Sequence, residues 1–150
     1  MAIEQITDSE DGLDVRDKLN TVISAASEIA TVTLSAAQIA ALDTTPIEAI
    51  AAPGANKVIL LESAFTQYTY STAAYNNVNM IVYYGTDSVN SNGFFRLSPT
   101  DDKNKLYASF DLEHESMVNT ALTLGVDNDP GTTGQGTAVV TLIYKTIDLS

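Results

Sequence analysis

The pattern of apolar and polar positions changes period near Pro46. Before it, apolar residues recur at helical spacing, and after it they alternate or form short runs between turn residues. In the stretch from residue 11 to residue 30 they follow one another at intervals of four, three, four and three, at Val15, Leu19, Val22, Ala26 and Ile29. This spacing predicts one short amphipathic helix with a narrow apolar seam, which is marginal in water unless a partner covers it.

The predicted helix has a start signal but is short for a coiled coil. Asp14 is a suitable N-cap, because its carboxylate can accept hydrogen bonds from the free amides of the first turn. The seam covers only about two heptads, fewer than the three or four typical of coiled coils. Three partners therefore stay open, namely the chain's own β domain, another copy of the chain and a different protein.

A second helix signal lies between residues 33 and 46. Ser35 and Gln38 form an S-x-x-Q capping box, and Leu34 and Ile39 occupy the two positions of a hydrophobic staple. The run D-T-T-P at 43–46 ends the helical pattern. We expect a helix of about two turns here, leading into a strand-rich domain.

The remainder of the chain has the pattern of short strands separated by turns. We expect strands at 46–52, 58–70, 78–85, 94–98, 106–114 and 137–149, and also at 118–126, where a short helix is the alternative. Turn or loop residues fill 53–57, 75–77, 86–93, 99–105 and 127–136. The predicted fold class is mainly β, with an antiparallel β-sandwich or jelly-roll-like domain over residues 34–150 that opens with the short helix. Residues 1–33 would form an N-terminal attachment or oligomerisation segment with one helix.

Composition excludes several classes of function. The net charge is -12 with 7 Lys and Arg, which argues against binding to a phosphate backbone. The chain has 0 Cys, so disulfides, thiolate zinc sites and thiol catalysis are excluded. The N-terminus lacks an export signal, and no apolar run approaches the length of a membrane span. We therefore expect no nucleic-acid partner and no insertion into a membrane.

Residues that could carry chemistry are sparse. His114 is the single histidine, and strand alternation places it on the opposite face from its neighbours Glu113 and Glu115. A position at the rim of the core therefore explains it better than an acid–base role. Asp127 and Asp129 could begin a calcium loop, although a plain turn explains the same residues. We predict no catalytic residues, no metal site and no cofactor, so the chain is not expected to be an enzyme.

Five tyrosines gather around two predicted strands and are candidates for a ligand or interface surface. The amphipathic tyrosine ring also suits a half-buried strand, and the lack of Trp argues against a sugar platform. The five residues are Tyr68, Tyr70, Tyr75, Tyr83 and Tyr84.

Three stretches resemble parts of phage virion proteins. Residues 9–23, S-E-D-G-L-D-V-R-D-K-L-N-T-V-I, resemble a G-x-x-V-R-x-K-[LI]-N signature of the N-terminal regions of tailed-bacteriophage fibre and head-fibre proteins. Residues 34–61 are similar to a block that recurs in phage virion proteins, and residues 136–149 look like the last strand of the same kind of domain. The matching positions of the first signature are Val15, Arg16, Lys18, Leu19 and Asn20.

The resemblance implies a virion structural protein that is assembled in the host cytoplasm. It would be a homotrimeric head-fibre or capsid decoration protein, anchored through its N-terminal segment to other proteins of the capsid or tail. The alternative is a receptor- or carbohydrate-binding module of a tail fibre, which would bind a host surface glycan through the tyrosines or the loops at 85–93 and 127–136. The candidate attachment and oligomerisation residues are Val15, Arg16, Lys18, Leu19, Val22, Ala26 and Ile29.

Overall fold

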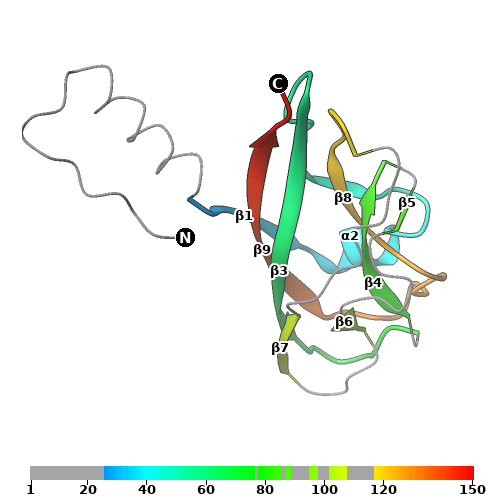
Figure 1. Cartoon of the computed structure of the whole chain (residues 1–150). Coiled ribbons are helices and arrows are strands. Elements are labelled where there is room, and N and C mark those ends of the chain that lie inside the picture. Colours follow the sequence, from blue (N-terminus) through cyan, green and yellow to red (C-terminus); the bar gives the residue numbers. More distant parts are fainter. Residues whose placement is uncertain (1–25, 77, 86, 89–94, 98–101, 108–116) are drawn as a thin grey trace, which may run out of the picture.

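Two antiparallel sheets form the molecule (Figure 1). The computed structural model describes residues 26–76, 78–85, 87–88, 95–97, 102–107 and 117–150. One sheet, called the β3 sheet below, has the order β1 (Glu28–Leu34), β9 (Thr137–Asp148), β3 (Lys57–Thr69) and β7 (Lys103–Tyr107). The other, the β4 sheet, has the order β2 (Ile47–Ile50), β8 (Leu122–Val126), β4 (Asn79–Tyr84) and β5 (Asp87–Ser88), and β6 (Phe95–Arg96) also pairs with β4.

The strand pairing is that of a jelly roll. With the two-residue β5 set aside, β1 pairs with β9, β2 with β8, β3 with β7 and β4 with β6. Pairing the first strand with the last, the second with the last but one, and so on inward, produces the nested Greek keys of that fold. The prediction of a mainly β, antiparallel, jelly-roll-like domain is confirmed.

The core lies between the two sheets. Along β3 every second residue points inward, and a bulge between Leu61 and Ser63 shifts the alternation so that it resumes at Ala64. Inward residues of the facing strands complete one apolar cluster. Its most deeply buried aliphatic side chains include Ile59, Met80, Val82, Leu122, Leu124, Val140 and Leu142.

The short helix α2 (Ala36–Ala40) begins with the predicted capping box. The hydroxyl Oγ of Ser35 accepts from the amide of Gln38 at 3.3 Å, and Oε1 of Gln38 accepts from the amide of Ser35 at 2.9 Å. Leu34 and Ile39 are both 0% exposed, as expected of a hydrophobic staple. The prediction of this helix and of its start is confirmed.

The first predicted helix is wrong at its C-terminal end. Residues 28–30 belong to β1, which pairs in register with β9 along its whole length. Ala30, Val32 and Leu34 point inward on alternate positions and pack on the core, so the period of two prevails over the helical spacing. The predicted boundary after residue 33 therefore falls inside a strand. Ala26 lies in a bend, while Val15, Arg16, Lys18, Leu19 and Val22 lie outside the described residues.

The other strand predictions differ from the structure mainly at their ends. β2, β3, β4, β6, β8 and β9 lie within or within one residue of the predicted strands. β7 begins at Lys103, in the predicted turn at 99–105, because Lys103 and Lys105 pair with Tyr68 and Thr66 of β3. The predicted loop at 86–93 contains β5, which pairs with the end of β4.

Candidate functional site

The outer face of the β3 sheet carries apolar side chains that the β4 sheet does not cover. Ile29 of β1 lies opposite Ile143 of β9, and Thr141 of β9 lies between Thr31 and Phe65. Ile29 is 69% exposed, an unusual value for so large an apolar side chain. We call the set Ile29, Phe65, Val139 and Ile143 the outer apolar face.

A group of polar contacts fixes the start of β1 at one end of this face. Ser27 donates from Oγ to Glu62 Oε2 at 2.6 Å, and Lys145 Nζ lies 2.9 Å from Glu62 Oε1. The hydrogen bond from Ser27, followed by the contact with Lys145, lowers the pKa of the Glu62 carboxyl below its usual 4.5. We call Ser27, Glu62 and Lys145 the N-terminal anchor. Because of it, the chain enters the domain at a fixed point beside Ile29.

Glu28 adds a second set of contacts at the same point. Its Oε1 accepts from the Thr146 hydroxyl at 2.9 Å, and its Oε2 accepts from the Tyr144 hydroxyl at 3.2 Å. Burial and the neighbouring Glu28 carboxylate raise the pKa of Tyr144. Glu28 thus has its carboxylate oxygens occupied by groups of its own sheet.

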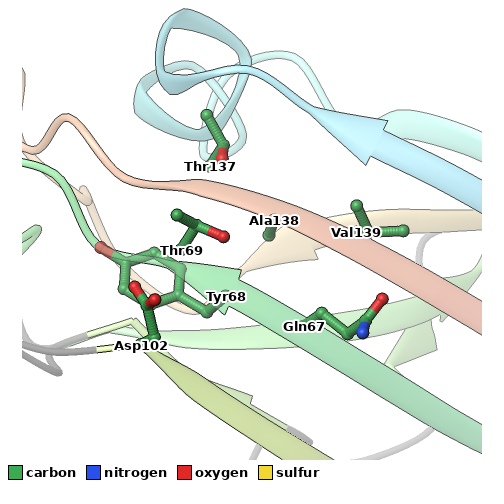
Figure 2. A pocket seen from close by; sticks show the side chains of 7 residues that line it. All are labelled: Gln67, Tyr68, Thr69, Asp102, Thr137, Ala138 and Val139. Carbon is green, nitrogen blue, oxygen red and sulfur yellow. The ribbon is translucent and has the colours of Figure 1, made fainter.

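A shallow hollow of about 260 Å³ lies at the other end of the same sheet (Figure 2). Asp102 Oδ1 accepts from the Tyr70 amide at 2.8 Å, which holds the carboxylate at the rim. The hollow is smaller than the roughly 300–1,000 Å³ of ordinary ligand pockets. Its lining, rich in hydroxyl and amide groups, consists of Gln67, Tyr68, Thr69, Asp102, Thr137, Ala138 and Val139.

The five candidate tyrosines do not form one surface. Tyr68, Tyr75 and Tyr84 are only 2%, 4% and 1% exposed and belong to the core, while Tyr70 and Tyr83 are partly exposed. The strands β3 and β4 are not neighbours, because they lie in different sheets that face each other across the core. The tyrosines that are close in sequence therefore do not share a surface, and those that are buried pack between the two sheets.

Two of the three buried tyrosines donate hydrogen bonds to backbone carbonyls, whereas the buried hydroxyl of Tyr68 has no hydrogen-bond partner among the described residues. Tyr75 donates from its hydroxyl to the Gly136 carbonyl at 2.7 Å, and Tyr84 donates to the carbonyl of Ile59 in the opposite sheet. Burial is the main reason that the pKa values of Tyr75 and Tyr84 are raised to about 12. These hydroxyls are neutral donors that join separate elements.

Gly134 and Gly136, which the sequence suggested only as turn residues, make room for the rings of Tyr75 and Tyr68. A Cβ on Gly134 would lie 2.1 Å from the Tyr75 ring, and one on Gly136 would lie 2.2 Å from the Tyr68 hydroxyl. The signal available in the sequence was the spacing of glycines in G-T-T-G-Q-G immediately before a strand, which often marks close approach of another group.

The two aspartates of the possible calcium loop are engaged in the turn. Asp127 accepts from the amide of Asn79 at 2.8 Å and from its Nδ2 at 2.7 Å, and Asp129 accepts from the amide of Gly131 at 2.7 Å. Within the described part of the chain no group of three or more His, Asp or Glu residues is arranged to hold a metal ion. His114 lies outside the described residues.

Of the helices in the portion that the structure describes, none has both the length and the apolar character that a membrane span requires.

Comparison with known structures gives a weak structural likeness. No protein-family model matches the chain, and no curated protein matches it. One chain of the structure titled "Cyanophage Pam1 capsid asymmetric unit" aligns over 79% of this chain and 84% of its own, with a TM-score of 0.42 and 12% sequence identity. A likeness of this size assigns neither a family nor a function.

Proposed function

We propose that the chain is a structural protein of a tailed-bacteriophage virion, a compact capsid decoration or head-fibre protein that forms a homotrimer and docks through its N-terminal segment. The observation that carries the proposal is the junction at Ser27. The segment with the phage attachment signature leads directly into the N-terminal anchor, beside the exposed Ile29. A segment that attaches to a particle needs a junction held to the domain by contacts such as these if the domain is to keep one orientation.

The topology supports the proposal without deciding it. Jelly rolls occur in viral capsid domains, and also in lectins and cupins, so the fold is compatible with more than one role. The outer apolar face adds a second argument, because an apolar centre with polar residues around it is the usual composition of a protein–protein contact. The N-terminal anchor and the hydroxyls of Thr69 and Thr137 provide the polar surroundings here.

Binding to capsids that lack the protein tests this function. We expect the wild-type chain to co-sediment with such capsids and Leu19→Asp, on the predicted seam, to bind at least about tenfold more weakly, a loss of about 1.4 kcal/mol. Thr21→Asp adds the same charge off the seam and serves as the matched control. A wild-type chain that never co-sediments contradicts the capsid role, and a monomer at micromolar concentration in light scattering contradicts the homotrimer.

The alternative is a carbohydrate-binding module, for which the hollow of Figure 2 is the specific observation. Gln67, Thr69 and Asp102 carry amide, hydroxyl and carboxylate groups that are able to hydrogen-bond to sugar hydroxyls. A glycan array that gives a signal with the wild-type chain and none with Asp102→Ala would favour it, and a blank array would remove it. In either role we propose that the chain is not an enzyme, which a turnover screen on host polysaccharides would check.

A further inference from the structure

The edge strands of the two sheets differ in how they are protected against pairing with other chains. Sheets in natural proteins protect exposed edges with short strands, charged side chains, proline or bulges. β2 has four residues, follows Pro46, carries the exposed Glu48 and contains a register shift after it. β7 has Lys103 and Lys105 in five residues, and β5 and β6 have two residues each.

β1 has none of these features along most of its length. It is seven residues long, E-I-A-T-V-T-L, and pairs with β9 without a shift in register. It contains no Lys, Arg or Pro, and its only charged residue, Glu28, has its carboxylate engaged by Tyr144 and Thr146. Among the described residues no strand pairs with its other side. β1 is therefore an open edge of the kind to which another strand can be added.

A second copy of the chain can supply a matching strand. Pairing through a sheet edge requires a partner with an equally open edge, and within the described part β1 is the strand that has one. The net charge of -12 makes two copies repel each other over most of their surface. At β1 this repulsion is small, because the central residues Ala30 to Thr33 are uncharged.

We propose that β1 pairs antiparallel with β1 of a second copy across a two-fold axis at Thr31. The two four-stranded sheets then form one continuous sheet. In this register Thr31 faces its own symmetry mate, Ile29 faces Thr33, and Glu28 faces Leu34. Like charges are not opposed, and threonine–threonine and aliphatic–threonine pairs are favourable neighbours across strands. An isologous contact of this kind is the commonest symmetry among oligomers.

The contact is independent of the proposed function. It uses the edge of the β3 sheet, whereas the proposed trimer would use residues of the N-terminal segment, so two-fold and three-fold contacts can coexist in one assembly. The same edge is available to the chain whether it acts on a virion or binds a glycan.

Single cysteines test the register, because the chain has 0 Cys of its own. Cβ-linked disulfides need Cα atoms roughly 4.4–6.8 Å apart, and residues directly opposite in antiparallel strands are about 4.5–5.5 Å apart. We expect Thr31→Cys to form a covalent dimer on mild oxidation. Thr33→Cys is the matched control, because its symmetry mate lies four positions along the strand, roughly 13 Å away. A Thr31→Cys chain that stays monomeric on a non-reducing gel, or equal cross-linking of both variants, overturns the proposal.

Light scattering with lysine variants tests the same contact without a covalent bond. Thr31→Lys with Thr33→Lys places two charges on the open edge, and we expect the molecular mass to fall to half that of the wild-type assembly. Gln67→Lys with Thr69→Lys adds the same charges at the same spacing on β3, which lies between β9 and β7 and is not an edge strand. This variant should leave the mass unchanged. The proposal is overturned if the double lysine variant of β1 has the same molecular mass as the wild type, with circular dichroism showing that it is folded. A second result also overturns the proposal: the wild-type chain is a monomer, and the double lysine variant of β1 loses its binding to capsids. In that case a strand of another virion protein pairs with β1.

Discussion

The inner and outer faces of the β3 sheet are built from the same strands and similar residues, yet they have different surroundings. Leu142 points inward and is 0% exposed beneath the β4 sheet, while its neighbour Ile143 points outward beside Ile29. Alternation along one strand thus divides apolar residues between a face that the β4 sheet covers and a face on which they are half-buried. The comparison shows that an apolar residue in this chain can be assigned to stability or to recognition only after its face is known.

Alanine at two adjacent positions gives the sharpest test of this division. We expect Leu142→Ala to lower the free energy of unfolding by about 2–5 kcal/mol, because it leaves a cavity between the sheets. Ile143→Ala should cost less, because its half-buried side chain faces away from the core and its removal leaves no enclosed cavity. Urea denaturation of both variants measures the difference. Equal losses would show that the outer face is covered in the folded chain.

A methyl group at Gly136 should be the next most damaging change, because it enters the inner face. Its Cβ would lie 2.2 Å from the Tyr68 hydroxyl, and overpacking of this kind costs about 1–3 kcal/mol. Combining Gly136→Ala with Tyr68→Leu should cost less than the two single changes added together, since leucine lacks the hydroxyl and also the ring carbons Cζ and Cε2, which would lie 2.4 and 2.6 Å from the new Cβ. Gly54→Ala is the control, with nothing within 4 Å of the new Cβ and only the strain of a φ of 100°. Fully additive losses in the double variant would contradict the contact.

Removing one buried hydroxyl should have a moderate effect that depends on pH. Tyr75→Phe loses the hydrogen bond to the Gly136 carbonyl, which is worth about 0.5–1.5 kcal/mol. Burial raises the pKa of Tyr75 from 10.0 to about 12, so its contribution is fully present below pH 10 and is lost as the pH rises towards 12. The unfolding free energy of the wild type should therefore fall over this interval more steeply than that of Tyr75→Phe. Parallel curves would show that the hydroxyl ionises as easily in the folded chain as in the unfolded one.

The smallest of these effects on the free energy of unfolding should come from the N-terminal anchor on the outer face when the pH is lowered. The pKa of Glu62 is lowered from 4.5 by Ser27 and Lys145, so its contribution is present above pH 4.5 and is lost as the pH falls through the folded-state value. We expect Glu62→Gln to flatten this acid-side decrease in unfolding free energy. Glu48→Gln, which makes the same change on the exposed side of β2, is the matched control. An unchanged slope in Glu62→Gln would mean that the N-terminal anchor contributes nothing to stability.

Local signals in the sequence predicted local structure well. The capping box at Ser35 and Gln38 depends on residues three apart, and the long alternating strands β3 and β9 carry their own pattern. β1 was missed because Ile29 and Ala26 continued a helical spacing, whereas the pairing that makes a strand of residues 28–30 comes from β9, more than a hundred residues later. Partners so distant in sequence leave no mark on local periodicity.

The candidate site was less predictable than the fold. The tyrosines were recognised as a group, but alternation within β3 and β4 does not reveal that the two strands face each other from different sheets. The N-terminal anchor joins Ser27, Glu62 and Lys145 from three strands or their ends, and no spacing in the sequence relates them. What sequence could have shown is the lack of protecting charge in residues 29–34, once that segment is read as a strand.

The antiparallel pairing of β1 with β9 also determines which parts of the domain are suited to engineering. Glu28 lies opposite Tyr144, so the chain enters and leaves the domain at the same end, with Asp148 only about 13 Å further along its strand. A peptide fused after Ser150 would therefore emerge at the same end of the domain as the N-terminal anchor. Ser71 and Thr72 are exposed and follow β3 at the opposite end of the domain, so the position between them is the better place to insert a displayed epitope.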